Sequence, residues 1–144
     1  MSNTAKLLFS GDFVYSKDVI ENDFEISSDF SNIIKNHDIF CCNLEGPIIN
    51  ENCRQIKKIG PNIYNSESSV KKLNKAGANL FCLANNHILD YGQNGLSNTL
   101  EFLDKEKIQH IGAGLNKQQT YSPYYIRINN IKIAFINIAT LAFL

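Results

Sequence analysis

The chain has 144 residues, of which 44% are hydrophobic and 19% charged, the composition of a globular protein with one core. Its 14 basic residues balance its 14 acidic ones, so the charge gives no reason to expect a nucleic acid or an anionic membrane as partner. No apolar run approaches the roughly 20 residues that span a bilayer, and the run at residues 7–9 is too short for a signal-peptide core. We therefore expect one cytoplasmic domain over residues 1–144, with no membrane span.

Short apolar runs alternate with helical patterns along most of the chain. This alternation is typical of βα units and predicts an α/β fold around a parallel sheet. Ser28 and Ser66 are the expected N-caps of the first two helices, and Gly77 is the expected end of the second. In chain order, the pattern predicts strands at Lys6–Ser10, Asp38–Cys42, Asn79–Ala84 and Gln109–Ile111, alternating with helices at Asp29–Asn36, Glu67–Ala76 and Gly95–Lys105.

The last part of the chain has a different pattern. Two β-rich runs, Tyr124–Ile128 and Ile131–Ile138, flank Asn129 and Asn130, and this predicts an antiparallel hairpin. The chain then stops at residues 141–144, directly after an apolar strand that another segment would have to cover. We therefore expect a single, truncated domain that ends in the hairpin, with the rest of the fold supplied by a C-terminal half or a partner chain.

Several residues of chemically reactive types are predicted to be structural. The cysteines form no C-x-x-C pair, and those in strand-like runs are expected to be reduced core thiols. The densest basic stretch is short and has no interleaved aromatic residues, which favours a solvated loop. A Gly-Ala-Gly string lacks the spacing of a phosphate-binding loop and is interpreted as a tight turn. The cysteines are Cys41, Cys42 and Cys82, the basic stretch is Arg54, Lys57 and Lys58, and the Gly-Ala-Gly string is Gly112–Gly114. The histidines His37 and His110 are likewise expected at the surface or in packing.

Polar residues follow the predicted strands. Asp12 follows the first, Asn43 and Glu45 follow the second, residues 85–90 follow the third, and Gly112–Gly114 follow the fourth. Because ligands of open α/β sheets bind beyond the carboxyl ends of the strands, these segments define one candidate site. Carboxylate oxygens, amide oxygens and the His87 imidazole suit manganese, magnesium, iron or zinc. Two such ions roughly 3.5–4 Å apart can activate a water and clamp a phosphoryl group, and the imidazole would then protonate a leaving oxygen.

Each of these residues also has a structural interpretation. Asp12 could cap a turn or helix, and Glu45 could bond loop backbone. Asn85 and Asn86 are typical of turns because they tolerate left-handed conformations. Asp90 is interpreted as structural, either as an N-cap or as a residue that holds a loop by hydrogen bonds. Its role would then be indirect, in holding residues 85–90, which we call the Asn-His loop. The pattern alone leaves these alternatives open.

Three strings stand at the ends of the predicted strands: Asn-Leu-Glu-Gly-Pro at 43–47, Ala-Asn-Asn-His-Ile-Leu-Asp-Tyr-Gly at 84–92, and Gly-Ala-Gly at 112–114. In this order they resemble the bacterial capsule-synthesis proteins of the CapA type, also called the poly-γ-glutamate synthesis family. The resemblance runs from about Leu7 to Ile138, and its Ala-Asn-Asn-His-x-x-Asp-x-Gly string is highly specific. That family is similar to the calcineurin-like metallophosphoesterases, so the resemblance implies a layered α/β fold, of which this chain would be the N-terminal half.

The resemblance also implies roles for residues of the candidate site. It implies a divalent metal cofactor (manganese, iron or zinc, with two ions in the full-length protein) and a capsule-polymer or phosphoester substrate. His87 would contact or protonate the phosphate. The implied metal ligands are Asp12, Glu45 and Asn86, and the implied supporting residues are Asn43, Asn85 and Asp90.

The chain departs from the ordinary phosphoesterase pattern in three ways. Val14 stands where such enzymes carry the histidine of an Asp-x-His string, and Glu45 stands where they carry a bridging aspartate. The family's further histidine strings, His-Trp-Gly and Gly-His-x-x-His, do not occur after His110. Two alternatives to a hydrolase therefore stay open: a non-catalytic scaffold or polymer-binding subunit of a capsule assembly or export complex at the membrane, and a truncated inactive fragment.

Overall fold

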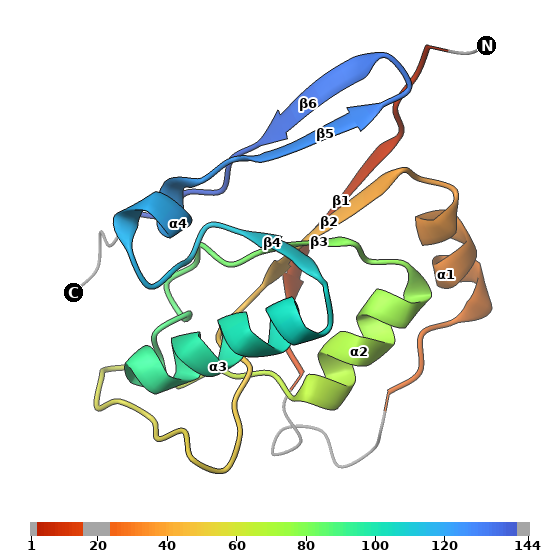
Figure 1. The fold of residues 1–144 in the computed structure, drawn as a ribbon. Helices are drawn as coiled ribbons and strands as arrows, with labels where there is room; N and C mark the ends of the chain where they lie inside the picture. The colour runs from red at the N-terminus through yellow and green to blue at the C-terminus, as the bar shows by residue number, and fades with distance from the viewer. Residues whose placement is uncertain (1–2, 16–23, 141–144) are drawn as a thin grey trace.

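The computed structural model of the chain describes residues 3–15 and 24–140. A four-stranded parallel sheet lies at its centre with the order β1-β2-β3-β4, and β5 and β6 form a separate two-stranded sheet (Figure 1). A helix lies between each pair of consecutive parallel strands, as the alternating pattern predicts. The elements are β1 (Leu7–Phe13), α1 (Ser28–Lys35), β2 (Ile39–Leu44), α2 (Glu67–Ala76), β3 (Leu80–Cys82), α3 (Gly92–Lys105), β4 (Gln109–Ile111), α4 (Lys117–Tyr121), β5 (Tyr124–Ile128) and β6 (Ile131–Phe135).

The parallel sheet is covered on both faces. The helices α1, α2 and α3 lie on one face, and the β5–β6 hairpin lies against the other (Figure 1). Successive residues of β2 alternate between these layers: Phe40 and Cys42 join the core under the helices, whereas Ile39 and Cys41 join the core under the hairpin. Burial on both faces explains why the central strands β2 and β3 read as apolar runs. The predicted layered α/β fold with a C-terminal hairpin is confirmed.

Local signals place most helix ends. Ser66 caps α2 and Gly77, with φ 120°, ends it, both as predicted. The predicted cap of α1 is wrong by one residue: the Ser27 hydroxyl accepts the capping hydrogen bond, and Ser28 is the first helical residue. α3 begins earlier than predicted, at Gly92, and the short helix α4 was not predicted.

The first two strands extend further than predicted, and this changes the position of Asp12. β1 contains an irregularity between Phe9 and Asp12, after which Asp12 pairs in parallel with Asn43 of β2. Asp12 and Asn43 therefore lie within strands and not, as predicted, after them. A bulge of this kind re-aims the side chains beyond it, which is one way in which a strand end comes to face a neighbouring strand's polar residues.

The hairpin turns at Asn129, whose φ of 53° is the left-handed conformation that asparagine tolerates. β6 ends at Phe135, earlier than predicted. Residues 141–144, on which the expectation of a truncated domain partly rests, lie outside the described residues. Among the helices of the described segments, none is both long enough and apolar enough to cross a membrane.

Candidate functional site

The carboxyl ends of β1 and β2 bring two carboxylates into contact with one carboxamide. Asn43 Nδ2 donates hydrogen bonds to Asp12 Oδ1 at 2.7 Å and to Glu45 Oε2 at 2.5 Å. The pairing of Asp12 with Asn43 across the two strands sets the first contact. Asp12 is exposed and Glu45 is buried, so one carboxylate of this cluster is hydrated and the other is largely shielded from solvent.

Asn85 ties the loop after β3 to the end of β2. Its Nδ2 donates to Asn43 Oδ1 at 3.2 Å and to the Leu44 carbonyl at 2.8 Å. Its Oδ1 accepts from the backbone N–H of Gly46 at 3.2 Å and from that of His87 at 3.1 Å. Asn85 does not adopt the left-handed conformation considered for it; among described residues other than glycine, only Lys107 and Asn129 do so. Its carboxamide instead fixes the distance between the two strand ends.

The imidazole of His87 lies between a buried carboxylate and this cluster. Its Nδ1 lies 2.8 Å from Asp90 Oδ2, and its Nε2 lies 3.9 Å from Glu45 Oε1. Asp90 is 1% exposed and also accepts from the Ile63 backbone N–H at 2.7 Å and from the Lys58 ammonium. α3 has no side-chain cap, so Asp90 does not act as its N-cap. Asp90 instead connects the Asn-His loop to the segment that precedes α2.

Asn86 is the remaining predicted ligand. It is exposed, and its side chain has no hydrogen-bond partner among the described residues. The donor types fit a divalent cation, because the Asp12 and Glu45 carboxylates converge on the N–H₂ group of one amide, a place that favours positive charge. The number of donors is small: nowhere in residues 3–15 and 24–140 do three or more His, Cys, Asp and Glu side chains form a group that could hold a metal. A metal held here would need further ligands.

Burial raises the pKa of Glu45 above its ordinary value of 4.5. The hydrogen bond from Asn43 acts in the opposite direction, and the negative charge of Asp12 raises the pKa further. A raised pKa means that the folded state binds this proton more tightly than the unfolded state does. In the metal-free protein, stability is therefore lost as pH rises from the ordinary carboxyl value through the folded value.

Glu45→Gln is expected to stabilise the metal-free fold at neutral pH, because it removes a charge that burial disfavours in the folded state. The gain should disappear below pH 4.5, the ordinary value, where the carboxyl is protonated in both states. Urea unfolding in the presence of a chelator measures both. Glu51→Gln, at an exposed carboxylate, is the control and should change little. A Glu45→Gln variant that is less stable than the wild type at neutral pH would contradict the expectation.

Lys58 contradicts its predicted place in a solvated loop. Its side chain is 22% exposed, and its ammonium contacts Asp90 and lies 3.1 Å from His87 Nδ1. The adjacent Lys57 is exposed, as predicted. Nothing in the composition of this stretch distinguishes one lysine from the other, so the sequence carried no signal for the inward turn.

Two further asparagines support the site and were not predicted. Asn65 is fully buried; its Oδ1 accepts from the Tyr15 backbone N–H at 2.8 Å, and its Nδ2 donates to the Glu45 carbonyl at 2.8 Å. Asn137, which follows β6, accepts from the Ala84 backbone N–H at 2.6 Å. These contacts hold the backbone on which Glu45 and the Asn-His loop depend.

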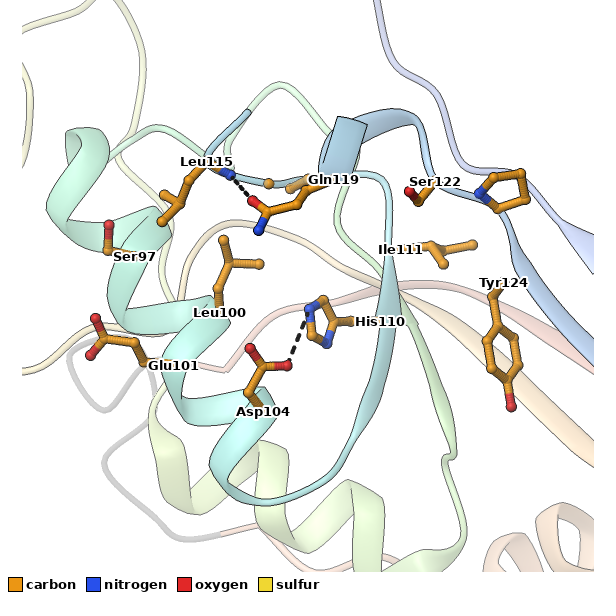
Figure 2. A pocket seen from close by; sticks show the side chains of 13 residues that line it. Ser97, Leu100, Glu101, Asp104, His110, Ile111, Leu115, Gln119, Ser122 and Tyr124 are labelled. Carbon is orange, nitrogen blue, oxygen red and sulfur yellow. Dashed lines mark hydrogen bonds and ion pairs between the residues drawn. The ribbon is translucent and has the colours of Figure 1, made fainter. Parts of the chain in front are cut away.

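A cavity of about 400 Å³ lies between α3, β4 and α4 (Figure 2). His110 forms part of its wall, with Nε2 3.9 Å from an oxygen of Asp104, whose side chain is 75% exposed. Ala113 and Gly114 of the turn after β4 line this cavity, but none of the candidate catalytic, metal-ligating or supporting residues does. We therefore place the candidate site at the strand ends and not in the cavity.

Comparison with known proteins identifies a family. The model of the family described as "Bacterial capsule synthesis protein PGA_cap" matches residues 6–142. "Capsule biosynthesis protein CapA" of Bacillus anthracis is 32% identical over 103 residues, which are 70% of this chain and 25% of that protein. "PGA biosynthesis protein CapA" of Bacillus subtilis (strain 168) is 30% identical over 112 residues, which are 77% of this chain and 28% of that protein.

The matched region is a small part of each relative but most of this chain. The chain spans about a quarter of the length of these curated relatives, so a relative's whole activity does not transfer to it. The family match, by contrast, covers nearly all of this chain, including all three strand-end strings and the hairpin. The chain therefore belongs to the bacterial capsule synthesis protein family.

Proposed function

We propose that this chain forms one part of a divalent-metal, phosphoesterase-like site in a protein of capsule or poly-γ-glutamate production. The supporting observation is the arrangement at the strand ends. The Asp12 and Glu45 carboxylates share one amide, and the imidazole of His87 faces Glu45 at 3.9 Å. Carboxylates and an imidazole gathered at the carboxyl ends of parallel strands are the donor types of such sites.

The residues divide into ligands and supports. Asp12, Glu45 and Asn86 would hold the ion, which we propose to be manganese, iron or zinc, with one or two ions in the whole protein. When bound, the metal supplies an activated water and charge stabilisation for a phosphoryl group. Asn43 and Asn85 would keep the two carboxylates at a fixed spacing, because their amides bridge the ends of β1, β2 and β3.

His87 would act directly on the substrate. Its Nδ1 lies against Asp90, so its Nε2 is directed toward Glu45 and the metal ligands. In the imidazolium form, with Nδ1–H held by Asp90, Nε2–H can donate a hydrogen bond to a phosphoryl oxygen or give its proton to a leaving oxygen. The substrate we propose is a phosphoester, either in the capsule polymer or in a precursor of it.

Removal of metal tests this proposal in the full-length protein. Chelation is expected to abolish hydrolysis of bis(p-nitrophenyl) phosphate, and manganese is expected to restore it. Asp12→Asn should lower the metal content per chain, measured by mass spectrometry of the metal, because it removes a charged ligand. Asp29→Asn, at a first-turn residue of α1, is the control and should leave the metal content unchanged. Hydrolysis that persists in chelator would contradict the proposal.

A second candidate is a non-catalytic scaffold or polymer-binding subunit. The small number of metal-type donors among the described residues favours it. It predicts that metal-free protein binds the capsule polymer as strongly as metal-loaded protein does. Co-sedimentation with purified polymer, with and without chelator, distinguishes this candidate from a hydrolase.

A further inference from the structure

Lys58 is a positive group in contact with the candidate site, and it comes from the segment between β2 and α2. Its ammonium forms an ion pair with Asp90 and lies 3.1 Å from His87 Nδ1. Its neighbours on both sides, Lys57 and Ile59, are exposed. The chain therefore turns this one side chain inward while it leaves the adjacent ones in solvent.

Asp90 needs such a partner. Its side chain is 2% exposed, and a buried carboxylate is costly unless it is paired and hydrogen-bonded. Its Oδ2 is occupied by His87 Nδ1 and by the backbone N–H of Ile63, which leaves Oδ1 for Lys58. The two oxygens of the carboxylate thus have separate partners, and one of the partners of Oδ2 is the imidazole proposed to act on the substrate.

The main chain supports the same contact. The Ile56 backbone N–H donates to the Asp90 carbonyl at 2.9 Å, and the Asn62 amide donates to the Ile56 carbonyl at 3.0 Å. The segment that carries Lys58 is therefore joined to the Asn-His loop by backbone as well as by side chain. An ammonium on a tethered segment has less freedom to leave than one on a mobile loop, so its position relative to His87 is set by the fold.

We infer that Lys58 is a positioning residue for His87, an inference that rests on the proposed function. Its ammonium holds the Asp90 carboxylate, and this carboxylate, which accepts from His87 Nδ1–H, confines the ring so that Nε2 faces Glu45 and the substrate. An ammonium offers only donors, so Lys58 can bond Asp90 but cannot take the place of Asp90 as an acceptor for His87. Lys58 therefore acts through its neighbours and not on the substrate.

The test compares three variants in the full-length protein. Lys58→Met keeps the length of the side chain and removes its charge, Lys58→Arg keeps the charge, and Lys57→Met is the matched control. In Lys58→Met the kcat for bis(p-nitrophenyl) phosphate is expected to fall roughly 10- to 100-fold with KM little changed, since partners of this kind orient the groups that react. Lys58→Arg should recover part of the loss, and Lys57→Met should lose nothing.

A second readout does not require activity. The ring nitrogens of His87 are followed by nitrogen-15 NMR in zinc-supplemented protein, with His87→Gln used to assign the signal. Lys58→Met should move this signal, whereas Lys57→Met should not. An unmoved signal and an unchanged kcat in Lys58→Met would overturn the inference.

The two proposals fail in different ways. A wild-type protein without hydrolysis would overturn the proposed function, while the NMR signal would still decide whether Lys58 positions the ring. A Lys58→Met protein that is active, with an unmoved His87 signal, would overturn the positioning role and leave the proposed function in place. If Lys58→Met does not fold, Lys58→Arg decides: a displaced signal and full kcat in that folded variant would also overturn the positioning role.

Discussion

His87→Ala is expected to lower phosphodiester hydrolysis by the full-length protein roughly 100- to 10,000-fold, the contribution typical of a positioned general acid or base. The reason is geometric. Nδ1 lies 2.8 Å from the buried Asp90, so Nε2 is the ring nitrogen directed toward the proposed ligand Glu45. Metal content should stay unchanged, because His87 is not among the proposed ligands. Steady-state kinetics and metal analysis of the same preparation measure both effects.

A matched control is available in the chain. His37 lies just beyond the end of α1, where its Nδ1 is 2.7 Å from the Ile33 carbonyl. His37→Ala removes an imidazole of the same size and should leave hydrolysis unchanged. Equal activity in His87→Ala and His37→Ala would show that the imidazole of His87 takes no part in the reaction. Loss of metal in His87→Ala would instead make this residue a ligand.

The elements with strong local signals match their prediction most closely. α2 has the predicted bounds, Glu67–Ala76, because a serine cap and a final glycine bracket an amphipathic run. β4 and β5 also have their predicted bounds. Asp12, Glu45 and His87 could be assigned to one edge of the sheet in advance, because parallel strands present their carboxyl ends together.

The start of α3 shows where local propensity misled. The helical spacing of apolar residues begins at Leu96, so the predicted helix began at Gly95, and Gly92 is a poor helix former that gives no sign of an earlier start. The structure gives Gly95 a packing reason instead. A Cβ at this position would lie 2.6 Å from the Tyr91 Cβ, which is too close, and 3.4 Å from Pro47, which is close to ordinary contact. Glycine therefore allows the first turn of α3 to fold back against Tyr91 while the helix packs on the loop after β2.

The supporting residues of the site were missed for a related reason. Lys58 contacts Asp90, which lies 32 positions away, and Asn65 contacts Tyr15, which lies 50 positions away. The segment between β2 and α2 has neither helical nor strand periodicity, so nothing in it predicts which side chains turn inward. A buried amide or ammonium is chosen by the unpaired groups it meets in the fold, and those groups come from other parts of the chain.

Asp90→Ala is expected to destabilise the fold by about 3 kcal/mol, because it leaves three donors without their acceptor. These donors are His87 Nδ1, the Ile63 backbone N–H and the Lys58 ammonium. Lys58 is 22% exposed and can partly turn to water, which places the expected value toward the lower end for a broken buried pair. Urea unfolding followed by circular dichroism measures the change.

Two comparisons separate this effect from the mere loss of a carboxylate. Asp104→Ala removes a side chain that is 75% exposed and should change stability by less than about 0.5 kcal/mol. Lys58→Met combined with Asp90→Ala should cost less than the sum of the two single changes, by about 1 kcal/mol or more, because the double variant has no unpaired ammonium. Strict additivity would mean that Lys58 and Asp90 are not coupled in the fold. The buried aspartate would then stabilise the Asn-His loop through His87 and Ile63 alone.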